Sequence, residues 1–266
     1  MVKILQILLQ ICLVAFLCVP GKVLHASDSD DRIESSAKES YVFKQYLKDE
    51  NIHIQSKEGA VTLTGTVSEK FQKSLANDMV TNLPDVKSVN NKLGLTSETP
   101  AVYSDAWILT KVKSTLSFHR NMDGMGIEVW VGDGTVTLRG NASSTAQKDL
   151  AAEYAMDVEG VKDVINEITL APAAMKPDIM RPDKAKLTEK IDIVMEFLDD
   201  ASITALAKTT LLYHRSTSAL NTTITTNDGV VKLEGNVKNA AEKELATKLV
   251  SDVHGVKSVV NIMTIN

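Results

Sequence analysis

Apolar and polar residues follow one pattern three times along the chain. A stretch with apolar residues every four positions is followed by two short alternating stretches, a second helical stretch and a last alternating stretch. A pair of turn residues containing glycine separates the first two alternating stretches, as in a β-hairpin. The order helix, strand, strand, helix, strand predicts an α+β fold of three tandem modules. In each module, a three-stranded sheet is expected to be covered on one face by two helices.

The middle copy shows this pattern most clearly. Its first helix is expected to be capped by Ser104-Asp105 and to bury Ile108, Val112 and Leu116, which the third copy matches with Ile203, Ala207 and Leu211. Its second helix is predicted to run roughly from 143 to 158. The last strand is expected to close the unit with the alternating positions Val164, Asn166, Ile168 and Leu170.

Glycines recur at fixed positions in the copies. One belongs to the hairpin turn, and a second follows six residues later. A third lies twenty residues further on, before a Val-Lys pair, where we expect it to end the second helix with a positive φ. The first copy has Asp85 at this third position. The glycines are Gly59 and Gly65 in the first copy, Gly134, Gly140 and Gly160 in the second, and Gly229, Gly235 and Gly255 in the third.

The start of the chain predicts export. A positive charge at Lys3, an apolar run over 4–19 and a small residue at Ala26 have the layout of a cleaved signal peptide. A retained membrane anchor or a lipid on Cys18 are the alternatives. The predicted divisions are a signal peptide over 1–26, a divergent first module over 27–98, a second over 103–171, a linker with an extra helix over 172–197, and a third module over 198–266.

Charge and cysteine content narrow the function further. The net charge is −5, and cleavage after Ala26 would remove two lysines, leaving 27 basic against 34 acidic residues and a charge of −7. Such an acidic chain is a poor partner for nucleic acid, because phosphate contacts dominate that affinity. Both cysteines, Cys12 and Cys18, lie in the signal, so the exported chain would have neither disulfides nor thiol chemistry.

The repeated residues resemble the BON domain of bacterial envelope proteins. The resemblance is carried by the glycine before Val-Lys, by Gly65, Gly140 and Gly235, and by the first-helix sequences Ser104-Asp105-Ala106-Trp107-Ile108 and Leu212-Tyr213-His214-Arg215. It implies an exported periplasmic protein that is often induced by osmotic stress. It also implies attachment to phospholipid surfaces or a chaperone-like role with outer-membrane or secreted proteins.

Seven residues are candidates for binding lipid or a protein partner, and all but one lie at the end of a first helix. Their arginines could hold phosphate, and the Trp107 ring could enter a membrane interface. Alternatively, a cation near a helix C-terminus and an aromatic ring in the core explain the same pattern. The residues are Trp107, Phe118, His119, Arg120, Tyr213, His214 and Arg215.

No motif points to catalysis or to a cofactor. His119 and His214 could share a metal only if two modules faced each other, so no metal site is predicted. The loop 122–126 lacks the flanks of a phosphate loop and is expected to expose its two methionines. We therefore expect a non-enzyme without cofactor, nucleic acid or small-molecule substrate, of undetermined oligomeric state. It either docks on phospholipid surfaces under osmotic stress or acts as a periplasmic chaperone or scaffold without lipid affinity.

Overall fold

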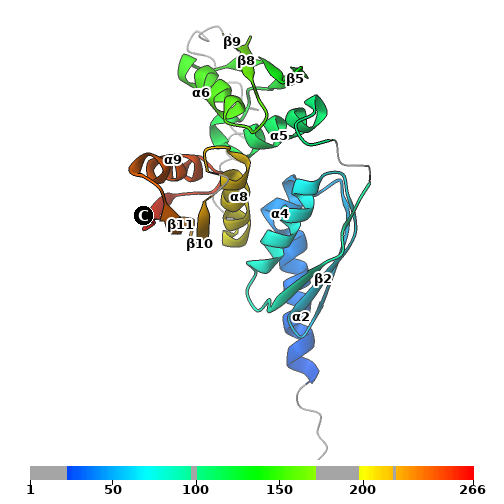
Figure 1. Ribbon diagram of the computed structural model, residues 1–266. Coiled ribbons are helices and arrows are strands. Elements are labelled where there is room, and N and C mark those ends of the chain that lie inside the picture. The colour runs from blue at the N-terminus through cyan, green and yellow to red at the C-terminus, as the bar shows by residue number, and fades with distance from the viewer. Residues whose placement is uncertain (1–22, 97–100, 172–197, 218–219) are drawn as a thin grey trace, which may run out of the picture.

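A computed structural model describes residues 23–96, 101–171, 198–217 and 220–266, which form three αββαβ modules (Figure 1). Module 1 contains α2 (Val23–Glu39), α3 (Tyr41–Gln45), β1 (Asn51–Lys57), β2 (Ala60–Val67), α4 (Lys70–Thr81), β3 (Ser88–Asn91) and β4 (Gly94–Leu95). Module 2 contains α5 (Asp105–Phe118), the 3₁₀ helix η1 (Arg120–Met122), β5 (Glu128–Gly132), β6 (Thr135–Arg139), β7 (Asn141–Ala142), α6 (Thr145–Met156), β8 (Asp163–Asn166) and β9 (Thr169–Leu170). Module 3 contains α8 (Asp200–Tyr213), β10 (Asn221–Asn227), β11 (Val230–Val237), α9 (Ala240–Ser251), β12 (Ser258–Asn261) and β13 (Thr264–Ile265).

The predicted α+β fold is confirmed. Most of the predicted signal peptide (1–22) and the predicted linker with its extra helix (172–197) lie outside the described residues. The expected cleavage point after Ala26 falls within the first turn of α2, which begins at Val23.

In each module the central strand pairs antiparallel with its hairpin partner and parallel with the last strand. The last strand is broken into two pieces after an asparagine, whose side chain bonds to the second helix and to the backbone beyond the break. In module 2, Asn166 Nδ2 donates to Lys148 O, and Asn166 Oδ1 accepts from Ile168 N. Ile168 is buried, but Leu170 is 50% exposed, because β9 lies at the end of the module, beyond its core.

The first helices bury the predicted faces. Ile108, Val112 and Leu116 are no more than 4% exposed, and Ser104 caps α5 by accepting from Trp107 N. The second helix of module 2 ends earlier than predicted, with Asp157 as its C-cap. Gly160 does not end this helix but lies in the turn that follows it.

One aspartate in each module ties the first helix to the hairpin turn. Asp105 accepts from the backbone N–H groups of Asp133 and Gly134 at 2.9 and 2.8 Å, and Asp200 accepts from Asp228 and Gly229 at 2.7 and 2.8 Å. Asp30 makes the equivalent contacts to Glu58 and Gly59 in module 1. These three aspartates therefore have a structural role, since each fixes the hairpin turn of its module to the first helix.

All eight predicted glycines have a positive φ. At Gly65 and Gly235, space is decisive as well. A Cβ would lie 2.0 Å from Asn51 O at Gly65 and 2.1 Å from Asn221 O at Gly235. These glycines allow the hairpin strands to pair where the backbone approaches most closely.

The prediction that loop 122–126 exposes two methionines is wrong. Met122 is 7% exposed and Met125 is 2% exposed. After α5 the chain turns through η1 and runs back beside the start of β7, where Asn141 N donates to Met125 O. Both thioethers therefore belong to the core.

Module 1 packs on module 3 through α4 and α8, which lie side by side in Figure 1. Lys208 on α8 donates to Asp78 on α4 at 2.8 Å, and Tyr46 OH donates to Ser117 O of module 2. Four aromatic rings from the three modules meet at this junction, with centroids 5.5 to 6.2 Å apart. They are Tyr46, Phe71, Phe118 and Tyr213.

Candidate binding site between the modules

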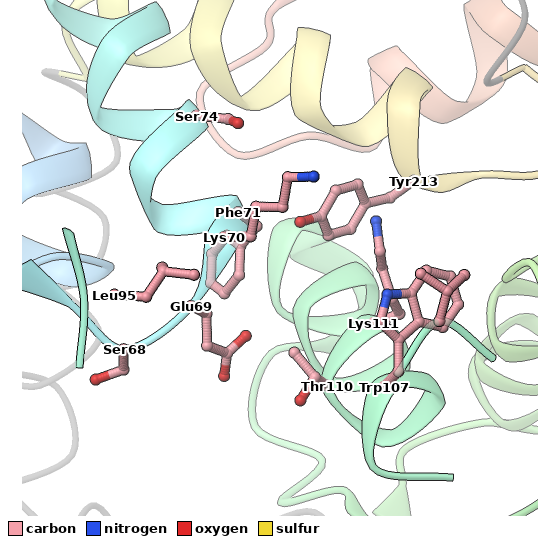
Figure 2. A pocket seen from close by; sticks show the side chains of 11 residues that line it. Ser68, Glu69, Lys70, Phe71, Ser74, Leu95, Trp107, Thr110, Lys111 and Tyr213 are labelled. Atoms are coloured by element: carbon pink, nitrogen blue, oxygen red, sulfur yellow. The ribbon is translucent and has the colours of Figure 1, made fainter. Parts of the chain in front are cut away.

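A cavity of about 330 Å³ opens where the three modules meet (Figure 2). One wall comes from the start of α4 and another from α5, and Tyr213 at the end of α8 closes the space between them. Most of the lining atoms are apolar. The lining residues are Ser68, Glu69, Lys70, Phe71, Ser74, Leu95, Val102, Trp107, Thr110, Lys111 and Tyr213.

Lys111 supplies a cation to this cavity. Its Nζ lies 3.4 Å from the centroid of the Tyr213 ring and 5.3 Å from that of Trp107 (Figure 2). Burial lowers the pKa of Lys111 to about 8; Glu159 opposes this shift and Lys70 adds to it. Within the described residues, the side-chain ammonium groups of Lys70 and Lys111 form neither a hydrogen bond nor an ion pair. Their charge is therefore available to an anion that brings its own apolar part.

Glu69 lies on the opposite wall as the N-cap of α4. It takes part in a capping box with Gln72, yet its Oε2 is buried without a hydrogen-bond partner among the described residues. Burial raises the pKa of Glu69, and the nearby Glu50 carboxylate adds to the shift. An unsatisfied buried oxygen beside a cavity can accept a hydrogen bond from a hydroxyl group in that cavity.

Exposed side chains of the segment before α5 lie beside the cavity, where Val102 lines it and Tyr103 contacts the lining residue Trp107. Val102 is 64% exposed and Tyr103 is 54% exposed. The Tyr103 ring packs edge-on against half-buried Trp107, and its hydroxyl donates to Glu159 at 2.7 Å. We call Val102, Tyr103 and Trp107 the apolar rim.

Four of the predicted binding residues lie elsewhere, at the interface of modules 2 and 3: His119, Arg120, His214 and Arg215. His119 and His214 are fully buried there, and their Nε2 atoms are 3.0 Å apart. His214 Nδ1 lies 3.1 Å from Asp157 Oδ2, and His119 Nδ1 lies 3.3 Å from Asp252 Oδ2. Burial lowers the pKa of His119; its contact with Asp252 opposes this shift.

The interface has approximate twofold symmetry. Arg120 N donates to Asp252 O, and Arg215 N donates to Asp157 O, at 2.9 and 2.7 Å. The guanidinium groups also donate to backbone carbonyls across the interface, Arg120 to Val256 O and Arg215 to Met156 O. The end of each first helix thus contacts the end of the other module's second helix.

The structure therefore separates the seven candidates. Trp107 and Tyr213 line the cavity, and Phe118 is buried in the aromatic junction. His119, Arg120, His214 and Arg215 lie at the module interface. The two modules do face each other, which was the condition for a shared metal. In the described part of the chain, however, no group of three or more His, Cys, Asp or Glu side chains could hold a metal ion.

The family model described as the BON domain matches residues 29–96, 104–172 and 199–266. The chain belongs to the BON-domain family. Its three matches coincide with the three αββαβ modules, so the resemblance seen in the repeated residues is confirmed.

Among curated BON relatives, osmotically-inducible protein Y of Escherichia coli (strain K12) is 29% identical over 202 residues, which are 76% of this chain and 91% of that protein. The outer membrane lipoprotein DolP of Haemophilus influenzae is 28% identical over 116 residues, 43% of this chain and 60% of DolP. The 21 kDa hemolysin of Actinobacillus pleuropneumoniae is 30% identical over 125 residues, 46% of this chain and 64% of the hemolysin. None of these names denotes an enzyme.

A solved structure of CdsD, a structural protein of the type III secretion system of Chlamydia trachomatis, covers 89% of this chain at 15% identity. Its TM-score of 0.21 is too low to support an argument. In the described part of this BON protein, no helix has the length and apolarity that a membrane span requires.

The sequence pattern did not indicate Lys70, Phe71 or Lys111. Phe71 belongs to module 1, whose repeat is divergent, and the repeat pattern does not show that its α4 lies opposite α5. Spacing in the chain could have identified Asp30, Asp105 and Asp200, which follow the same intervals of 75 and 95 residues as the glycines.

Proposed function

We propose that this BON protein is an exported, periplasmic envelope protein that docks on anionic phospholipid surfaces and supports the envelope under osmotic stress. The names of its relatives, an osmotically inducible protein and an outer membrane lipoprotein, support the cellular setting. The observation that carries the docking proposal is the apolar rim beside Lys70 and Lys111. Aromatic and aliphatic side chains next to cations that form no hydrogen bond or ion pair with the described residues suit the boundary between lipid headgroups and acyl chains.

A local patch is required because the protein as a whole is acidic. An anionic membrane would repel the average surface, so attraction has to come from a few cations near the rim. Arg120 and Arg215 contribute less in this proposal, because their guanidinium groups are held by carbonyl oxygens at the module interface.

The test is flotation of the purified exported chain with vesicles, anionic against zwitterionic, at low and moderate salt. We expect salt-sensitive flotation with anionic vesicles only. Trp107→Ala should reduce it severalfold, whereas Trp130→Ala, at the 45% exposed tryptophan of the opposite sheet face, should not. Lys111→Glu should act likewise, with Lys238→Glu at an 80% exposed lysine of module 3 as control. Flotation that is absent, or equal for all variants, would contradict docking at this rim.

A periplasmic chaperone or scaffold is the second candidate, because the cavity is an apolar cleft between modules. Such a cleft could take apolar side chains of an unfolded envelope protein. Suppression of aggregation of an unfolded outer-membrane protein, lost in Phe71→Ala but not in Trp130→Ala, would favour this function. Activity of this kind without flotation would replace the first proposal.

A further inference from the structure

We infer that the cavity between the modules binds a single lysophospholipid molecule, with its one acyl chain between the modules and its phosphate at Lys111. This inference deepens the proposed function, because it assigns a soluble, single-chain ligand to a site whose rim is proposed to meet membranes. In addition to docking on a membrane surface, the protein would bind one lysophospholipid molecule in this cavity.

The size of the cavity favours one chain. Its volume of about 330 Å³ lies at the low end of small-molecule pockets, which are roughly 300–1,000 Å³. Phe71, Leu95 and Trp107 offer apolar contact on facing walls, as Figure 2 shows. A single alkyl chain suits this space, whereas the two chains of a diacyl phospholipid would leave one chain in water.

The polar groups favour a phosphate and a hydroxyl. Lys111 and Lys70 are cations without a hydrogen bond or ion pair in the described chain, and an anion placed between them would offset the cost of burying Lys111. Glu69 Oε2 is a buried acceptor that also lacks a partner within the described residues. The free hydroxyl of a lysophospholipid glycerol can donate to it, and a fatty acid has no such group.

Tryptophan fluorescence provides the assay. Trp107 and Trp130 are the only tryptophans, so Trp130→Phe leaves the cavity residue as the sole reporter. The probe is lauroyl lysophosphatidic acid below its critical micelle concentration. Monolauroyl glycerol lacks only the phosphate, and glycerol phosphate lacks only the chain. We expect saturable binding of the first, affinity at least about tenfold weaker for the second, and no binding of the third.

Variants separate a ligand contact from a structural role. Lys111→Gln should remove the preference for the phosphate-bearing probe, whereas Lys238→Gln, at an 80% exposed lysine of module 3, should retain it. Glu69→Gln should weaken both acyl probes by a similar factor. Denaturation midpoints of each variant show whether the fold is intact. Equal affinity for the two acyl probes in the parent protein would overturn the role of Lys111, and no saturable binding would overturn the site.

The pH profile is an independent readout. Because the pKa of free Lys111 is about 8, affinity for the phosphate probe should fall by up to about tenfold per pH unit above pH 8. The ionisable groups around it are Lys70 and Glu69 on α4, Glu159 after α6, and Tyr213, whose pKa burial raises. Lys111→Arg keeps its charge and should abolish this fall. A profile unchanged by that substitution would contradict the assignment.

The two proposals can fail separately. Flotation with no binding of soluble lysophospholipid would contradict only the cavity site. Saturable lysophospholipid binding with no flotation would contradict only docking on membranes.

Discussion

His119 Nε2 lies 3.0 Å from His214 Nε2. The two histidines occupy equivalent positions in modules 2 and 3. Both side chains are fully buried. At this distance one nitrogen has to donate a hydrogen and the other has to accept it. The approximate symmetry of the interface is therefore broken at its centre by a single hydrogen atom.

The burial of His119 indicates which histidine is the acceptor. Burial lowers the pKa of His119, which favours a neutral ring that accepts through Nε2 and carries its hydrogen on Nδ1, 3.3 Å from Asp252 Oδ2. His214 then donates through Nε2, while its Nδ1 lies 3.1 Å from Asp157 Oδ2.

Acid should weaken this interface. A proton added to His119 Nε2 would place two N–H groups against each other at 3.0 Å. Because the pKa of His119 is lower in the folded than in the unfolded chain, its contribution is complete above the unfolded value of about 6.5. It is lost as pH falls from there through the folded pKa. Urea midpoints measured from pH 8 to pH 5 should decline more steeply for the parent protein than for His119→Gln.

The pH dependence of the urea midpoint has to be compared between the two proteins, because other ionisable groups also titrate between pH 8 and pH 5. Exposed His53→Gln, on the outer face of β1, should leave the slope of the parent protein unchanged. Parallel curves for the parent protein and His119→Gln would refute the proton arrangement described above.

His254 should have the opposite pH dependence. Burial disfavours its charged form, but Asp123 and the Phe118 carbonyl outweigh this and raise the pKa of His254. Its stabilising effect is therefore full below about pH 6.5 and is lost as pH rises through the folded pKa. His254→Gln should destabilise the protein more at pH 6 than at pH 8.5 in urea denaturation. A larger loss at the higher pH would exclude this assignment.

Asp200 should stabilise module 3 through its two backbone hydrogen bonds. Hydrogen bonds to a charged group contribute about 1.5–3 kcal/mol each, and the half-buried Asp200 carboxylate should achieve the lower part of that range. With two such bonds, Asp200→Ala should reduce the free energy of unfolding by about 3 kcal/mol. Asp149→Ala, on the exposed face of α6, should change it by less than about 0.5 kcal/mol. Equal effects in chemical denaturation would show that the turn contact is not needed.

Gly235 should tolerate no side chain. Alanine there would need φ of +136° and would place its Cβ 2.1 Å from Asn221 O. We expect Gly235→Ala to cost at least about 3 kcal/mol, or to prevent folding of module 3. Gly132 has open space around it and no positive φ, so Gly132→Ala is the matched control. Circular dichroism during thermal unfolding compares the two, and similar melting temperatures would contradict the prediction.

Periodicity predicted the modules well because each module is a local structure. The faces of α5 and α8, the hairpins and the order of elements all follow from residues within about 70 positions of one another. The error in the 122–126 loop was local too, because the burial of this loop depends on where the chain turns back. Alternation along a strand does not contain this information.

The sequence identified most of the candidate residues but did not predict which contacts they make. The repeated Phe-His-Arg and Tyr-His-Arg positions indicated a contact, and the structure shows that their histidines and arginines contact the neighbouring module. Trp107 and Tyr213 were selected, but Lys111 was not, since a lysine on an exposed-looking helix position is usually solvated. Only its place between two rings distinguishes it.

The sequence by itself determined three αββαβ modules, their glycines and their membership of one family, because hydrogen-bonding and hydrophobic periodicity act over short distances along the chain. The tertiary structure alone decided which surfaces of the modules meet. The buried histidine pair and the cavity at Lys111 bring together residues of different modules, as many as 145 positions apart for Ser68 and Tyr213. Their arrangement depends on shape and charge complementarity between whole modules, which a pattern within any one module does not specify.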